Sequence, residues 1–409
     1  MDAHPHLTVG QRIKRHRERI GMTRPVLGGL VGKSAEWVKA VESGRIQTPR
    51  LPVLLRIASA LRLEDLADLA GNGHAVPVAV FAGAQHAALA EVRAALTDYR
   101  IAPSAPPPSS AHLRSRLRSA WQVRHSSPDH RTQLGNLLPS LIRDAQRAVR
   151  THAEPADRRD SRRVLSGVYC LTDFYVAYQP APELVWLVAD RAITEGQEAD
   201  DPYAIAAGCW AMVGALRDAG RWDEAIALAT DAARNLESSL NDDAPPDWRG
   251  MCGALEAEIA LVHARRGSHG EAWAHLERAD AIARRLGDDY RHVQSSFSTA
   301  VMAAHATTLD VELRRAGEAL RAADRVDPDL IASVPRRARH LIEIARAHHQ
   351  RGERHAVWAL LDRSHRTAPE TIRYNGFARE MLLDLVDTPP SGLRQDVRAL
   401  ANAVGVMAA

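Results

Sequence analysis

Lysine is almost absent from this sequence of 409 residues, and aromatic side chains make up only 5% of it. Lys14, Lys33 and Lys39 are its only lysines, so arginine supplies nearly all of the positive charge. Alanine, leucine and arginine are abundant instead, and all three favour helix over strand. We therefore expect an all-α fold, and a chain of this length divides into two or more domains.

Cysteine pairs and long hydrophobic runs are also missing. Cys170, Cys209 and Cys252 are far apart and form no CxxC motif, which argues against a disulfide framework and favours buried thiols in a reducing cytoplasm. The apolar stretch 75–84 contains a proline and a glycine and is about half as long as a membrane helix requires. Because no signal peptide precedes the first charged helix, we expect a cytoplasmic protein without membrane contact.

The sequence contains none of the motifs that mark common catalytic sites. GxSxG, HExxH, P-loop and Rossmann-type GxGxxG patterns are missing, the histidines are scattered, and Cys170 has no identifiable base. We expect neither an enzyme nor a cofactor or metal site.

Positive and negative charge are separated along the chain. The net charge is +3 overall, but residues 1–70 carry +5, residues 111–170 carry +7 and residues 171–409 carry −9. A basic front end and an acidic rear suggest that one end meets a polyanion and the other does not.

The first seventy residues read as four or five short helices. Thr23 and Pro25 form a helix start, Gly32 ends that helix, and Ser34 caps the next one. Two short helices joined by such a turn make a helix-turn-helix unit. The apolar residues expected to form the faces of these helices are Ile13, Ile20, Val26, Leu27, Leu30, Val38, Val41, Leu54, Leu55, Ile57, Ala58 and Leu61.

Residues 10–66 resemble the XRE, or phage-repressor, family of DNA-binding domains. The resemblance rests on Gly21, Gly32, Glu42, Gly44 and Pro49. It implies a helix-turn-helix DNA-binding domain over residues 8–70, in which the helix 34–42 enters the major groove. It also implies a structural ion pair between Arg17 and Glu42.

The same resemblance implies a set of DNA-contacting residues. Arg24 matches a phosphate contact, Arg50 matches a minor-groove contact, and the outward face of the recognition helix is expected to run from Ala35 to Ala40. The full set is Arg24, Lys33, Ser34, Ala35, Glu36, Trp37, Lys39, Ala40, Arg45 and Arg50.

The recognition helix departs from the family at two positions. Ala35 and Ala40 stand where relatives often have Gln or Arg, and alanine makes no bidentate hydrogen bond to a base. Base recognition would then depend on Glu36, Trp37 and Lys39, or on DNA shape. Trp37 could instead pack against the following loop.

A linker is expected over residues 71–111. It contains one amphipathic helix, 85–99, and the Pro/Ser-rich stretch IAPSAPPPSSA at 101–111. The helix could pack on either domain or pair with a second copy of the chain.

From residue 112 onward the sequence repeats one pattern: a helix, a glycine turn, and a helix with small residues at fixed offsets. Three copies turn at Gly220, Gly267 and Gly352. Their offset residues are Ala225, Ala229 and Ala232; Ala272, Leu276 and Ala279; and Val357, Leu361 and Ser364. A fourth copy fits without the glycine through Ala316, Leu320, Ala323 and Pro328. The offsets resemble the tetratricopeptide repeat, which implies an α-solenoid over residues 112–409 with a concave surface.

A repressor-like head before a tetratricopeptide-like body resembles the RRNPP regulators, which sense peptide pheromones. The resemblance implies a sequence-specific transcriptional regulator that binds double-stranded DNA as a homodimer. The body would sense a peptide, a small molecule or a partner protein. The alternative is a protein-interaction scaffold with weak or lost DNA binding.

The residues that line the ligand groove are not determined by the sequence. The arginine-rich turns Arg265-Arg266, Arg336-Arg337 and Arg339 could hold a carboxylate, or they could be solvated helix ends.

Overall fold

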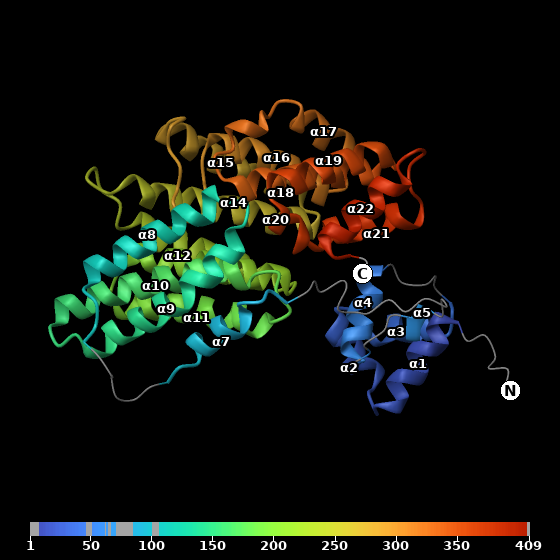
Figure 1. Ribbon diagram of the computed structural model, residues 1–409, viewed down its shortest axis with the longest axis horizontal. Coiled ribbons are helices and arrows are strands. Elements are labelled where there is room, and N and C mark those ends of the chain that lie inside the picture. The colour runs from blue at the N-terminus through green and yellow to red at the C-terminus, as the bar shows by residue number, and fades with distance from the viewer. Residues whose placement is uncertain are drawn as a thin grey trace. The chain divides into compact units, whose positions relative to one another are not determined.

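The computed structural model describes residues 8–45, 51–61, 63, 67–70, 85–99 and 106–406. Within these ranges the regular structure is helical and includes no strand, as the composition predicts. The chain divides into two compact units (Figure 1), a head formed by Met1–Ala84 with Gly405–Ala409 and a rear unit formed by Gln85–Val404.

The described part of the head consists of short helices. They are α1 (Val9–Arg19), α2 (Arg24–Val31), α3 (Ala35–Glu42), α4 (Leu51–Ala60) and α5 (Ala67–Ala70). Gly32 ends α2 with a φ of 67°, a left-handed conformation that glycine adopts without steric strain. Ser34 then caps α3, because its Oγ accepts the N–H of Trp37 at 3.1 Å. Helices α2 and α3 therefore form the predicted helix-turn-helix.

A small apolar core holds the head together. Its buried members are Ile13, Leu27, Val31, Val38, Val41, Leu54, Ile57, Ala58, Leu61, Leu63 and Leu69. The sequence prediction is wrong for Ile20, Val26 and Leu30, whose exposed fractions are 42%, 52% and 60%. Leu27 and Val31 already fill the inner face of α2, and the neighbouring pair Val26 and Leu30 lies on the other side of the helix.

The rear unit is a long series of helices. They are α7 (Leu89–Leu96), α8 (Ser110–Ser126), α9 (His130–Thr151), α10 (Pro155–Val176), α11 (Pro182–Glu198), α12 (Pro202–Asp218), α13 (Trp222–Glu237), α14 (Pro246–Arg266), α15 (His269–Leu286), α16 (Thr299–Glu312), α17 (Ala316–Ala323), the 3₁₀ helix η1 (Pro328–Leu330), α18 (Val334–Gln350), α19 (Arg354–Thr367), α20 (Pro369–Arg373), α21 (Gly376–Asp387) and α22 (Arg394–Val404).

These helices pack as successive hairpins, and the first helices of the hairpins form an inner row. Helix α8 packs on α9, α10 on α11, and the pattern continues to α18 on α19. The inner row, α8, α10, α12, α14, α16 and α18, also packs side by side in that order, and α18 contacts α8 again. The rear unit therefore closes on itself. Figure 1 shows the stacked hairpins, from cyan through orange-red.

The repeat turns occur where the sequence places them in three copies. Gly220, Gly267 and Gly352 have φ angles of 76°, 86° and 76°. All nine offset residues that follow them in the second helices are buried, with exposed fractions of 5% or less. These small side chains allow the paired helices to approach closely, which confirms the predicted repeat in these copies.

The fourth copy has a different register from the one predicted. Its left-handed turn residue is Arg314, with a φ of 61°. The side chains of Ala316 and Leu320 are only partly buried, whereas Ala319, five residues after Arg314, is fully buried. No glycine marks this turn in the sequence, and the predicted register lies three residues N-terminal to the observed one, at Ala316 instead of Ala319.

The helix expected within the linker belongs to the rear unit. Helix α7 packs on α9 and contributes Leu89, Val92, Ala95 and Leu96 to the main apolar core. This is one of the alternatives that the sequence leaves open.

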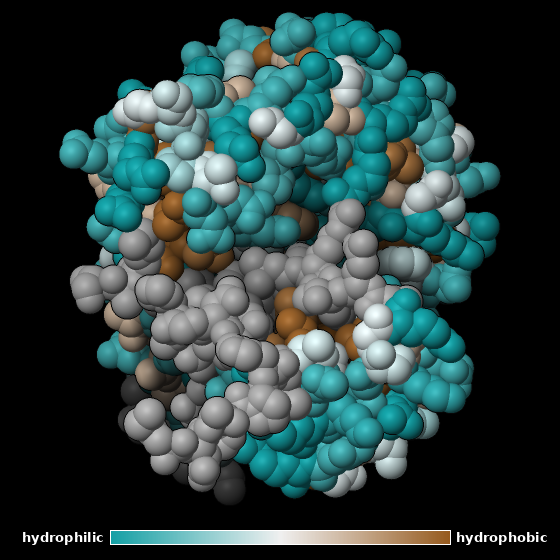
Figure 2. Space-filling view, turned by 90° about the vertical axis from the view of Figure 1, so that its right-hand side faces the viewer, coloured by the Kyte–Doolittle hydropathy of each residue, from teal (hydrophilic) through white to brown (hydrophobic). Residues whose placement is uncertain are grey.

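The three cysteines are free and buried. None of the helices in the described ranges is long and apolar enough to span a bilayer. The face seen in Figure 2 is mainly hydrophilic, with small hydrophobic areas between polar ones.

Candidate DNA interface and enclosed cavity

The turn and the recognition helix α3 present several polar side chains to solvent. Lys33, Ser34, Glu36, Lys39 and Arg45 are exposed, as predicted. Lys33 lies in the turn before the helix, and Lys39 lies within it, four residues from its end when Glu42 is counted as the first. The arrangement gives α3 a polar, mainly cationic outer side.

The remaining predicted positions on α3 are less accessible. Ala35 is half-buried, and Ala40 is only 5% exposed, so the prediction that Ala40 faces outward is wrong. Ala40 packs inside the head together with Val38, Val41 and Glu42, the other buried residues of this short helix. A methyl group at this depth is not available to a thymine methyl.

The side chain of Trp37 packs on the core of the head and also remains partly exposed. Its ring is half-buried against the apolar core of the head. The ammonium of Lys33 lies 5.7 Å from the ring centroid, within the range of a cation–π contact. The ring therefore anchors the turn and positions Lys33 at the start of the recognition helix.

A buried carboxylate ties the head helices together. Glu42 of α3 accepts hydrogen bonds from Arg17 Nε at 2.5 Å and Arg17 Nη2 at 3.1 Å, which confirms the predicted ion pair with α1. It also accepts one from Arg24 Nε at 2.7 Å. Burial raises the pKa of Glu42, but the hydrogen bonds from Arg17 and Arg24 outweigh this effect and hold it below its usual value.

Arg24 therefore has a structural contact that the sequence analysis does not include. Only its Nε is used in the bond to Glu42, and 37% of its side chain is exposed at the start of α2. Thr23 occupies the N-cap position, but its side chain makes no capping hydrogen bond, so the first N–H groups of α2 have no cap from it. Arg50, the expected minor-groove contact, lies outside the described residues.

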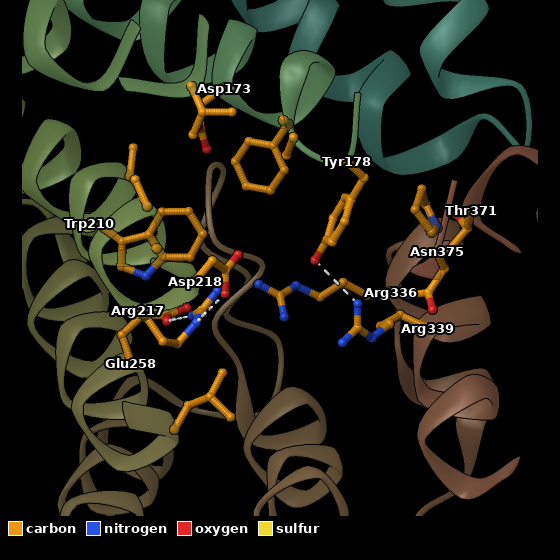
Figure 3. A pocket seen from close by; sticks show the side chains of 18 of the residues that line it. Asp173, Tyr178, Trp210, Arg217, Asp218, Glu258, Arg336, Arg339, Thr371 and Asn375 are labelled. Carbon is orange, nitrogen blue, oxygen red and sulfur yellow. Dashed lines mark hydrogen bonds and ion pairs between the residues drawn. The ribbon is translucent and has the colours of Figure 1, made fainter. Parts of the chain in front are cut away.

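A cavity of about 480 Å³ lies in the rear unit, where the inner row encloses its centre. Each helix of the inner row contributes to its wall. Representative lining residues are Arg124 on α8, Asp173 and Phe174 on α10, Trp210 and Arg217 on α12, Glu258 on α14, His305 on α16, and Arg336 and Arg339 on α18. Figure 3 labels several of them, Asp173, Trp210, Arg217, Glu258, Arg336 and Arg339, which come from helices far apart in sequence.

Part of the charge around the cavity is neutralised within the wall. Arg217 is paired with Glu258 and with Asp218, the latter at 3.2 Å. Arg339 is paired with Glu343 at 2.6 Å and donates to the hydroxyl of Tyr178 at 3.2 Å. These pairs are drawn in part as dashed lines in Figure 3.

Other charged groups of the wall have no such neutralisation. Arg124 is only 9% exposed, and its Nε and Nη1 have no hydrogen-bond partner among the described residues. Arg336 makes no hydrogen bond or ion pair within the described part of the chain. Burial lowers the pKa of Arg124 to about 9, and repulsion from Arg131 and Arg336 contributes to the same shift. The cavity thus has an excess of positive charge.

The histidines among these arginines are neutral near pH 7, and the nearby carboxyl of Asp173 is only partly ionised. Burial and the adjacent arginines lower the pKa of His130 to about 2 and that of His305 to about 3. Burial raises the pKa of the Asp173 carboxyl to about 7. Near neutral pH these three groups therefore compensate little of the positive charge.

One group in the described residues brings three potential metal ligands within 4.8 Å of one another: His263, Glu271 and His275. The imidazole rings of the two histidines are stacked, with an interplanar angle of 16°. His275 Nδ1 is hydrogen-bonded to Glu256 at 2.7 Å. Stacked rings do not aim two nitrogens at a common point, as a tetrahedral metal site requires.

The sequence analysis identifies only part of the cavity. Of the arginine-rich turns, Arg265, Arg336 and Arg339 line it, whereas Arg266 and Arg337 do not. Arg124, Asp173 and Trp210 were not predicted. The signal that could have found Arg124 is the basic stretch 111–170, which has a net charge of +7.

Comparison with known proteins identifies the head. Residues 8–70 match the family model described as a helix-turn-helix domain. The N-terminal unit is therefore a helix-turn-helix domain, as its geometry indicates. No curated protein matches the sequence.

Among solved structures, three that the chain resembles at low identity are PlcR and two forms of the competence regulator ComR. Bacillus thuringiensis PlcR, solved with the peptide PapR7 and DNA, is 14% identical, and the match covers 86% of this chain and 98% of PlcR with a TM-score of 0.28. ComR from S. thermophilus, solved with DNA and its signalling peptide ComS, is 17% identical over 73% of this chain and 99% of ComR, with a TM-score of 0.25. ComR from Streptococcus vestibularis, solved with its signalling peptide XIP, is 15% identical over 74% and 98%, with a TM-score of 0.28.

Proposed function

We propose that the protein is a DNA-binding transcriptional regulator whose rear helical unit senses a ligand. The observation that carries the proposal is the exposed cationic side of α3, where Lys33, Lys39 and Arg45 surround a recognition helix in a folded helix-turn-helix domain. In such domains this helix lies in the major groove, and cationic residues around it contact phosphates. A protein with this function acts on DNA in the cytoplasm and needs no catalytic site.

Phosphate contacts are the proposed role of the cationic residues at the head surface. Lys39 and Arg45 are available for direct contacts, and the uncapped start of α2 offers N–H groups and the Arg24 guanidinium to a further phosphate. Base recognition then falls to Glu36 and the half-buried Trp37, because Ala35 and Ala40 offer no hydrogen bond.

The proposal extends to a homodimer and to regulation by an effector. A dimer would read two half-sites about one helical turn apart, on the same side of the duplex. An effector in the rear unit would act only through its different affinity for two arrangements of that dimer.

The test is a fluorescence anisotropy titration of the full chain with duplexes from the region upstream of its own gene. We expect Lys39→Gln to weaken binding to all duplexes and to reduce the slope of log K against log salt by about 1. Arg284→Gln is a matched control, because it removes one charge from the surface of the rear unit, where its side chain is 76% exposed.

Two outcomes contradict the proposal. One is the absence of DNA binding at low salt while the head remains folded, which would favour the scaffold alternative. The other is an equal effect of Lys39→Gln and Arg284→Gln, which would mean that the binding is diffuse attraction rather than docking of α3.

A further inference from the structure

The cavity of the rear unit differs from an ordinary gap between helices because it contains charge that its own wall does not balance. Its six arginines are Arg124, Arg131, Arg217, Arg265, Arg336 and Arg339, and its four carboxylates are Asp173, Asp218, Glu258 and Glu343. Three of these carboxylates are already bound to arginines, and the fourth, Asp173, has a pKa raised by burial to about 7.

Two of the arginines are positioned to meet a ligand. Arg336 extends from α18 into the cavity, between Tyr178 and the Arg217–Asp218 pair (Figure 3). Arg124 approaches from α8, with its guanidinium 4.9 Å from the ring centroid of Phe174. Its Nε and Nη1 remain buried without a hydrogen-bond partner among the described residues. An unsatisfied buried guanidinium is costly, and an anion placed beside it would supply the missing hydrogen bonds and charge.

Aromatic side chains form the adjoining wall of the cavity. Phe174 and Trp210 stack with centroids 5.7 Å apart and an interplanar angle of 20°. Tyr178 and Trp186 also line the space. Convergent polar groups beside an apolar wall, in a volume of a few hundred Å³, are typical of small-molecule sites.

We infer that this cavity binds a small organic anion, with its acidic group between Arg124 and Arg336 and its apolar body against Phe174 and Trp210. This inference rests on the proposed sensing function and names the ligand class of its sensor. A guanidinium binds carboxylate, sulfonate or phosphate oxygens through two parallel hydrogen bonds, which accounts for the choice of an anion. The surplus of positive charge argues against a cationic ligand, and the apolar wall argues against a bare inorganic ion.

The site also explains why the wall holds histidines and a neutral carboxyl. His130 and His305 remain uncharged, and in the tautomer that carries the proton on Nδ1 each can donate an N–H to an acidic group. Asp173, when protonated, does not repel an anion. The cavity therefore presents its positive charge through arginines only.

The experiment uses the full chain and two fluorescent probes of similar shape. 1-Anilinonaphthalene-8-sulfonate carries an acidic group, and N-phenyl-1-naphthylamine lacks it. We expect one sulfonate probe to bind per chain, at least tenfold more tightly than the neutral probe. Arg336→Gln should weaken the sulfonate probe about tenfold, which corresponds to about 1.4 kcal/mol, and leave the neutral probe unchanged.

Arg337→Gln provides the matched control. Arg337 is the next residue of the same helix, but it does not line the cavity and bonds to the carbonyl of Ile331 instead. It should leave both affinities unchanged. Near-ultraviolet circular dichroism of each variant verifies the fold, and Arg336 is preferred to the more deeply buried Arg124 because its loss is less disruptive.

Three results would overturn the inference. They are equal affinities for the two probes, equal effects of Arg336→Gln and Arg337→Gln, and displacement of the sulfonate probe by inorganic phosphate at lower concentration than by an aromatic carboxylate. DNA binding by the same samples separates this inference from the proposed function. If the protein binds DNA but does not prefer the sulfonate probe, only the anion site is contradicted. If it prefers the sulfonate probe but does not bind DNA, only the proposed regulator function is contradicted.

Discussion

The head and the rear unit use arginine in opposite ways. In the head, the buried arginine Arg17 is matched to a buried carboxylate, Glu42, and the cations Lys33, Lys39 and Arg45 lie on the surface. In the rear unit many surface arginines are paired with acids, for example Arg266 with Asp223 at 2.6 Å. Inside that unit, two arginines of the cavity wall, Arg124 and Arg336, have no acid partner among the described residues.

Charged side chains that are paired within the protein stabilise its fold, whereas those without an acid partner are available to bind a ligand. An exposed lysine or arginine costs little to keep, so its presence on the head fits contact with a polyanion. A buried guanidinium without a carboxylate destabilises the empty protein, so its persistence indicates a partner that supplies the missing negative charge. Each unit therefore offers positive charge to a ligand, at the surface of α3 in the head and inside the cavity of the rear unit, and the two ligands differ in size.

The largest expected effect on stability comes from breaking the Arg17–Glu42 ion pair in the head. Glu42→Ala leaves Arg17 buried without its carboxylate and also releases Arg24, so we expect a loss of about 3–5 kcal/mol in the stability of the head. Thermal unfolding followed by limited proteolysis should report this loss in residues 8–70 while the rear unit stays folded.

Glu18→Gln is the control for that experiment. Glu18 also contacts Arg17, at 3.3 Å, but its side chain is 53% exposed, so the change should alter stability by less than about 1 kcal/mol. Similar losses in both variants would mean that burial does not distinguish the two carboxylates.

The next effect concerns the carboxyl group in the cavity. Burial raises the pKa of Asp173 to about 7, so the folded protein retains a proton that the unfolded chain has already released, and stability falls as the pH rises towards 7. Asp173→Asn should therefore stabilise the rear unit at pH 8 by on the order of 1–3 kcal/mol and have little effect near pH 4.

Asp218→Asn is the control with the opposite sign. Burial raises the pKa of Asp218, but Arg217 and Arg265 outweigh this and lower it, so its charged form stabilises the fold. The substitution should destabilise the rear unit at pH 8. Melting temperatures from pH 4 to pH 8 measure both variants, and a pH-independent effect of Asp173→Asn would contradict the assignment.

A smaller effect is expected at the closure of the rear unit. Glu370 accepts hydrogen bonds from the backbone N–H groups of Arg131 at 2.5 Å and Thr132 at 3.2 Å, so it caps helix α9 from a position 238 residues away from Thr132. Glu370→Gln removes the charge of this cap and should cost about 1–2 kcal/mol. Glu224→Gln, at an exposed pair with Arg221, should change the denaturation midpoint little. If the two variants unfold alike, the cap contributes nothing.

The head could be predicted well because its information is local. The capping residue Ser34 and the turn at Gly32 follow from short spacings within one small domain, and the Arg17–Glu42 pair follows from the family resemblance. The error at Ala40 arose because exposure on a helix of eight residues depends on how neighbouring helices enclose it, and the sequence of the helix does not contain that.

The cavity could not be predicted because its members come from distant helices. Arg124 and Arg336 are brought together only by the contact between α8 and α18, which closes the inner row. The repeat pattern specifies how each hairpin packs on the next, whereas closure depends on small rotations that add up over all of the hairpins. The sequence therefore indicates the hairpins and not the space that they enclose.

The smallest effect expected tests the repeat register itself. Arg314 adopts a φ of 61° at the position that glycine occupies in the other copies, and a left-handed conformation strains a residue with a side chain by about 1–2 kcal/mol. Because glycine also gains entropy in the unfolded chain, Arg314→Gly should stabilise the rear unit by only about 0.5–1 kcal/mol. Gly220→Arg makes the reverse change at a turn with a φ of 76° and open space around it, and it should destabilise by a similar amount. Chemical denaturation of the two variants measures both, and opposite signs would establish that the two positions are equivalent in the repeat.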